Sequence, residues 1–173
     1  MIFVFDSSPL IYLARSGALP FLTALKGEKY LPPIVFDEVV TTGRVHGFPD
    51  AEITDQFIIQ GVLQVKSPEE RVKEGLRGLH RDLHAGEIRV LALADELNGI
   101  VIIDDRIGRE IGEMFQIEVR GSVFILFLLV RDRIITQKKA KQILRVMVRE
   151  GFRIGAEQCL VFHDLLDQVP EEK

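Results

Sequence analysis

Two short apolar runs, residues 2–5 (IFVF) and 100–103 (IVII), constrain the fold of this 173-residue chain most strongly. Four uninterrupted apolar residues bounded by polar ones are typical of a strand buried on both faces. Such strands belong to parallel sheets, whose faces are covered by helices. Before the second run, Ile88, Leu91 and Leu97 recur at helical spacing. The pattern therefore predicts an α/β fold with a parallel sheet covered on both faces.

The remaining elements follow from apolar spacing and turn residues. Ser8 and Pro9 fit the N-cap and first position of a helix that Gly17 closes. A chain of this length fits one domain over 1–173, with a core of about 1–130 and C-terminal helices at about 131–170. We expect further strands at 28–31, 62–65 and 117–120, and helices at 19–25, after 32–33, and at 51–59, 68–80, 87–97, 106–115, 123–130 and 137–149.

Composition excludes several classes of protein. The single Cys159 makes no intramolecular disulfide, and His80 and His84 lack the glutamate of a helical zinc motif. The longest apolar run, 123–130, is far shorter than the ~20 residues of a membrane helix. The N-terminus has no basic region, so it does not read as a signal peptide. We therefore expect a soluble cytoplasmic protein with no membrane partner.

Charge is distributed unevenly along the chain. The net charge is -4, but residues 131–153 carry +6, which leaves -10 for the rest. An acidic body with one basic segment suits an anionic partner held at one place. A solvated helix face explains the charge equally well. We use the name basic strip for four residues of this segment: Lys138, Lys141, Arg145 and Arg149.

Acidic residues occupy positions that a parallel sheet brings together. Asp6 follows the first apolar run, and Asp104 and Asp105 follow the second, while Glu38 and Glu87 lie near helix starts. The carboxyl ends of parallel strands share one edge, where ligands bind. Each acid alone is also explained as a turn or first-turn helix residue. Clustered carboxylates must take up protons unless a cation lies among them, and Mg²⁺ or Mn²⁺ prefers such oxygen ligands. An ion held there would suit phosphodiester hydrolysis.

With these acidic positions, the sequence resembles a known family, the PIN-domain nucleases, and within it the stand-alone prokaryotic group related to VapC-type toxins. The resemblance implies a three-layer α/β/α sandwich with a mostly parallel sheet. It also implies an endoribonuclease dependent on Mg²⁺ or Mn²⁺ that leaves a 5′-phosphate, with an antitoxin as partner if the chain is a toxin. The matching stretches are 3–15 (FVFDSSPLIYLAR), 32–40 (PPIVFDEVV), 85–94 (AGEIRVLALA), 100–109 (IVIIDDRIGR), 120–135 and 151–154.

The resemblance assigns roles to individual residues. Asp6 and Asp104 would hold the metal, with Glu87 and Asp105 binding it or orienting the water. Glu38 would anchor the shell, and Ser8 would help to hold the first acid or a water. Of Asp104 and Asp105, Asp104 is favoured as the inward-pointing residue. The family often has Thr or Ser two residues before its last acid, where this chain has Ile102 or Ile103.

Substrate contacts are less constrained by the sequence. Arg106 and Arg109 lie one helical turn apart and would contact the RNA phosphate or form surface ion pairs. The basic strip would hold the RNA backbone without reading its sequence. The apolar helix at 123–130 is either a core helix or part of a homodimer face.

Two other functions compete with the nuclease. One is a PIN-like domain that binds RNA or protein without useful catalysis, which the isoleucines before Asp104 favour. The other is a response-regulator-like switch, which expects the acidic pair after the first strand, whereas here it follows a late one.

Overall fold

The computed structural model describes residues 1–69 and 85–170. Its centre is a five-stranded sheet in the order β3-β2-β1-β4-β5, in which every neighbouring pair is parallel. The expected α/β fold with a parallel sheet is confirmed, although three strands are shorter than the apolar runs that predicted them. The strands are β1 (Ile2–Phe5), β2 (Glu28–Leu31), β3 (Gln64–Val65), β4 (Ile100–Ile102) and β5 (Val119–Arg120).

Helices connect and cover these strands. The helix expected at 68–80, with His80 and His84, lies outside the described residues apart from its first two positions. The helix expected at 19–25 is a shorter 3-10 helix at Leu19–Thr23, and the helix after Pro32 contains a π-helical segment. The helical elements are α1 (Ser7–Arg15), η1 (Leu19–Thr23), α2 (Pro33–Phe36), η2 (Asp37–Thr42), α3 (Gly43–Val45), α4 (Pro49–Ile59), α6 (Ala85–Leu97), α7 (Arg106–Met114), α8 (Ser122–Arg131), α9 (Gln137–Arg149) and α10 (Ala156–Asp167).

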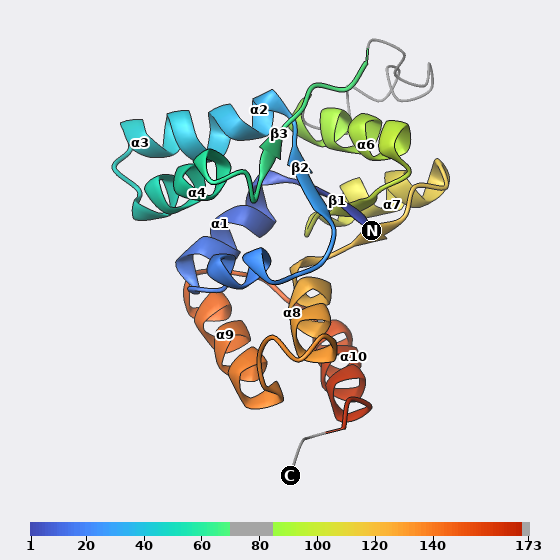
Figure 1. The fold of residues 1–173 in the computed structure, drawn as a ribbon. Coiled ribbons are helices and arrows are strands. Elements are labelled where there is room, and N and C mark those ends of the chain that lie inside the picture. The colour runs from blue at the N-terminus through green and yellow to red at the C-terminus, as the bar shows by residue number, and fades with distance from the viewer. Residues whose placement is uncertain (70–84, 171–173) are drawn as a thin grey trace.

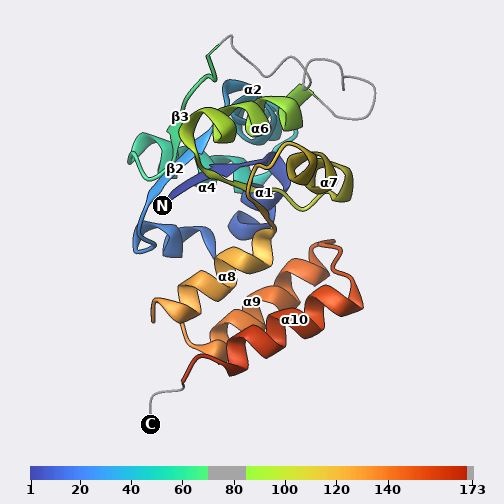
Figure 2. The same ribbon diagram turned by 90° about the vertical axis from the view of Figure 1, so that its right-hand side faces the viewer.

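The sheet reverses its direction of growth between β1 and β4. The chain runs from β1 outward to β2 and β3, then returns to β4 beside β1 and continues outward to β5. Because parallel crossovers are right-handed, α1 and α6 cover opposite faces. Figures 1 and 2 show α6 on one side of β1 and α8, which packs against α1, on the other. The carboxyl ends of β1 and β4 therefore meet at the switch point, where open α/β sheets bind ligands.

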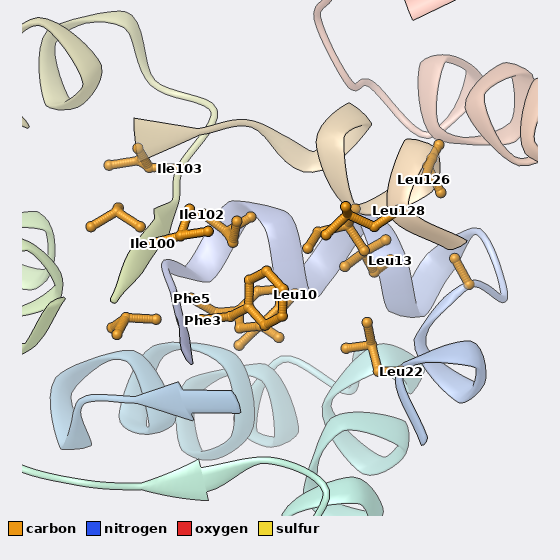
Figure 3. Packing of buried hydrophobic residues seen from close by; sticks show 14 of the residues in the cluster. Phe3, Phe5, Leu10, Leu13, Leu22, Ile100, Ile102, Ile103, Leu126 and Leu128 are labelled. Atoms are coloured by element: carbon orange, nitrogen blue, oxygen red, sulfur yellow. The ribbon is translucent and has the colours of Figure 1, made fainter. Parts of the chain in front are cut away.

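The α8 helix belongs to the core. Figure 3 shows Leu10 and Leu13 of α1 between the β1 phenylalanines and Leu128 of α8. All of these side chains belong to one buried cluster. α8 is covered by α1, α9 and α10, so the core-helix alternative for 123–130 is confirmed. Within the described residues no helix is both long and apolar enough to cross a membrane.

The start of α1 differs from the prediction. The helix begins at Ser7, and its N-cap is Asp6, whose backbone is still extended, so the N-cap assigned to Ser8 was wrong. Pro9 is the third helical residue and not the first. It is tolerated there because the first four N–H groups of a helix have no intrahelical acceptor. The helix thus starts directly at the end of β1, which places Asp6 at the edge of the sheet.

Candidate functional site

Asp6 lies at the switch point of the sheet. Its backbone N–H donates to the Ile102 carbonyl at 3.0 Å, which joins the ends of β1 and β4. Its side chain is buried, with a residue exposure of 7%. Ile102 is followed two residues later by Asp104, so this backbone contact brings the two acidic strand ends together.

The pKa of Asp6 is raised from 3.8 to about 7. Burial is the largest cause, and the charges of Glu87, Glu38 and Asp104 raise the pKa further, while the backbone N–H of Ser7 lowers it. Burial and nearby like charges both disfavour an ionised carboxylate. Three of the other four predicted acids therefore act on Asp6 at this edge, although the four residues come from four separate segments of the chain.

Glu38 and Glu87 reach the edge from two helices. Glu38 belongs to the π-helical segment η2, and its carboxylate accepts a hydrogen bond from the Ser7 hydroxyl. It lies against the first turn of α6, because a Cβ atom on Gly86 would stand only 3.4 Å from Glu38 Oε1. Glu87, next to that glycine, is buried with 8% exposure. The Glu38 carboxylate is thus within van der Waals reach of position 86, next to Glu87.

Asp104 and Asp105 play different structural parts. Asp104 accepts hydrogen bonds from the Ser122 backbone N–H at 2.8 Å and from the Ser122 hydroxyl at 2.5 Å. Burial raises the pKa of Asp104, while the Ser122 hydrogen bonds and the nearby Arg109 charge lower it. Asp105 is exposed and caps α7 by accepting from Gly108 N at 2.8 Å. The structure therefore brings Asp104, and not Asp105, to the Asp6 carboxylate.

Two serines that sequence reasoning did not select lie at the site. Ser7 holds Glu38, and Ser122 holds Asp104. Ser122 follows β5 as Asp6 follows β1, so the argument from strand ends could have found it. Ile102 and Ile103 are fully buried in the core. The hydroxyl at the last acid thus comes from the neighbouring strand end.

The other predicted residues are more dispersed. Ser8 is half-buried in the first turn of α1. Arg106 is exposed, with 83% of its side chain accessible, and its Nε lies 2.8 Å from Glu110 Oε1. Arg109 points inward, and its charge acts on Asp104. Its buried Nε has no hydrogen-bond partner among the described residues. The two arginines are thus divided between the surface and the acidic edge.

The basic strip lies on α9. Lys138, Arg145 and Arg149 are exposed, and Lys141 forms an ion pair with Asp167, with 3.6 Å between Nζ and Oδ1. Figures 1 and 2 place α9 beyond α1, at the opposite end of the molecule from α6, which carries Glu87. The basic strip and the α6 end of the acidic edge therefore lie on different parts of the molecule.

The chemistry of the acidic edge fits a divalent cation. In the described part of the chain, no group of three His, Cys, Asp or Glu side chains is already arranged as a cation site. The donors are nevertheless carboxylate oxygens, which Mg²⁺ and Mn²⁺ prefer. The pKa of Asp6 is raised mainly by burial and further by the charges of Glu87, Glu38 and Asp104. A bound divalent charge would offset both effects, because it favours the ionised carboxylate.

The fold and this acidic edge agree with the comparison with known families. The family model described as "DUF3368: PIN domain" matches residues 2–168, so the chain belongs to the PIN domain family. Among curated proteins, it is similar to Endoribonuclease Nob1 of Methanocaldococcus jannaschii, with 30% identity over 125 residues. The match covers 70% of this chain and 56% of the relative, so the chain spans little more than half of that protein.

Proposed function

We propose that this protein is an endoribonuclease that depends on Mg²⁺ or Mn²⁺. The observation that carries the proposal is the meeting of Asp6, Glu38, Glu87 and Asp104 at the switch point, where the pKa of Asp6 is raised to about 7. Membership of the PIN domain family and the similarity to an endoribonuclease support the choice of RNA hydrolysis over other reactions of a metal site.

Each acidic residue has a part in this proposal. Asp6, Glu87 and Asp104 would hold the ion, and Glu38, held by Ser7, would complete the shell. A divalent ion supplies Lewis-acid stabilisation of the phosphodiester and acidifies the attacking water. Asp105 would act only indirectly, by capping α7. Arg109 would face the phosphate, because its guanidinium lies beside Asp104.

The test is incubation of the purified protein with single-stranded RNA and Mn²⁺ or Mg²⁺. We expect cleavage that EDTA and the Asp6→Asn substitution both abolish. Cleavage that persists in EDTA would contradict the metal dependence. A folded wild-type protein that cuts no RNA would favour the alternative of a PIN domain that binds without catalysis.

Removing the Ser122 hydroxyl should weaken catalysis through Asp104. We expect Ser122→Ala to lower the cleavage rate by about 10- to 100-fold, the usual cost of losing a group that orients a metal ligand. Because the hydroxyl lowers the pKa of Asp104, its loss should also move the acidic limb of the pH–rate profile to higher pH. A lower rate with an unchanged pH profile would indicate a packing defect instead.

The basic strip is proposed to bind the RNA backbone. Replacing Lys138, Lys141, Arg145 and Arg149 by glutamine should weaken RNA binding and flatten its dependence on salt. For single-stranded RNA, removing one charge that binds a phosphate reduces the slope of log K against log salt by about 0.7. Unchanged affinity and slope would assign the strip to a solvated helix face.

The finer proposal is that the enzyme is a single-domain, cytoplasmic toxin of the VapC type, which the matching stretches of the sequence support. It implies an antitoxin protein, and a homodimer is proposed as the assembly. Expression of the chain should then arrest growth, and co-expression of a small protein encoded beside its gene should restore it. Normal growth at high expression of an active ribonuclease would favour an RNA-processing role.

A further inference from the structure

A groove adjoins the acidic edge on the side of α8. It is about 530 Å³ in volume and lies between α7, β5, α8 and α10. This volume falls within the range of small-ligand sites, roughly 300–1,000 Å³. We name it the α8 groove, and the residues that matter for its chemistry are Arg109, Glu113, Arg120, Phe124, Phe127 and Glu157.

The groove and the acidic site share a wall. Arg109 lines the groove, and the same side chain acts on the charge of Asp104. Gly121 also lines it, and a Cβ atom on that glycine would stand 3.0 Å from Asp104 Oδ1. A ligand at this end of the groove is therefore separated from Asp104, a candidate metal ligand, only by Arg109 and Gly121.

Its walls combine aromatic rings with a stacked guanidinium. Phe124 and Phe127 are half-buried, with ring centroids 6.3 Å apart. The Arg120 guanidinium carbon lies 5.5 Å from the Phe124 ring centroid. Aromatic rings and arginine planes are the surfaces on which unpaired nucleobases stack.

The charges of the groove favour a nucleobase over the phosphate backbone as its ligand. Two arginines, Arg109 and Arg120, are balanced by two carboxylates, Glu113 and Glu157. A wall with no net charge does not attract a run of phosphates. It does suit one flat, uncharged heterocycle, whose ring N–H and amino groups can donate to the carboxylates.

We propose that the α8 groove binds one unpaired nucleobase of the RNA strand next to the bond that is cut. The inference rests on the proposed ribonuclease function. It makes the enzyme selective for single-stranded RNA, because a base inside a duplex cannot enter the groove. Phe124 with Arg120 forms the stacking surface, and Arg109 lies between the bound base and the acidic edge.

A tryptophan reporter tests this directly, because the chain contains no tryptophan. Phe124→Trp would be made together with Asp6→Asn, so that binding is measured without cleavage. Short single-stranded RNA should quench the tryptophan fluorescence by stacking, whereas the matching RNA duplex should not. Phe48→Trp in the same background is the control, because Phe48 is 46% exposed and does not line the groove.

Affinity gives the second measurement. In the Asp6→Asn background, Phe124→Ala should weaken the binding of single-stranded RNA about tenfold. Leu160→Ala, at a neighbouring exposed position on α10 outside the groove, should leave the affinity unchanged. Equal quenching of both reporters, or no loss with Phe124→Ala, would overturn the proposal even if the wild-type protein cuts RNA. Quenching together with loss of binding would support a base-binding groove even if no cleavage is found, and the absence of cleavage would then contradict only the proposed ribonuclease function.

Discussion

Asp104→Asn is expected to lower RNA cleavage by more than about a hundredfold, because loss of a group that merely orients a metal ligand already costs 10- to 100-fold. Asp104 is half-buried, acts on Asp6 and accepts two hydrogen bonds from Ser122. The same substitution at Asp105 should change the rate by less than about threefold, since an asparagine oxygen can still cap α7.

The neighbouring pair is its own control, because both variants change one charge at nearly the same place in the chain. Rates would be measured with single-stranded RNA at saturating Mn²⁺, after circular dichroism has established that both variants are folded. Equal losses in the two variants, or a larger loss with Asp105→Asn, would reverse the assignment.

Asp6→Asn should make the metal-free protein more stable at about pH 8 and leave it nearly unchanged at about pH 4. The folded protein keeps a proton on Asp6 up to about pH 7, whereas the unfolded chain releases it near pH 3.8. The free energy of unfolding therefore falls as the pH rises through this window. A pKa unit corresponds to about 1.4 kcal/mol, so the gain at the higher pH is a few kcal/mol.

Urea denaturation in EDTA at both pH values would measure this difference, and the lower pH serves as the internal control. Mn²⁺ at about 100 times its Kd should then stabilise the wild-type protein by roughly 2.7 kcal/mol. It should have little effect on Asp6→Asn, which has lost a ligand. Equal stability of the two proteins at the higher pH would show that neither burial nor the neighbouring charges raise the pKa of Asp6.

The sheet and most of the acidic edge could be predicted because they depend on local patterns. Uninterrupted apolar runs identify buried strands, and Asp6 and Asp104 follow two such strands that must end at the same edge. Glu38 and Glu87 could be placed there because the helices that follow parallel strands begin at that edge. These inferences need only that all strands run in the same direction, which is what defines a parallel sheet.

The sequence favours Asp104 over Asp105, but it carries no physical reason that decides between them. The choice depends on Ser122, which lies 18 residues away in sequence and donates to only one of the two carboxylates. The hydrogen bond between Ser7 and Glu38 likewise joins residues that are far apart in the sequence, so it depends on tertiary packing. Side-chain partners across separate segments carry no periodic signal that one sequence could reveal.

Anomalous diffraction from crystals grown with Mn²⁺ would locate the ion relative to the four acidic segments. We predict one strong peak within coordination distance, roughly 2.0–2.5 Å, of carboxylate oxygens from Asp6 and Asp104. The peak should be absent from Asp6→Asn crystals grown in the same way. A wild-type crystal with no peak at the ends of β1 and β4, or with its manganese bound elsewhere, would contradict a metal site at this edge of the sheet.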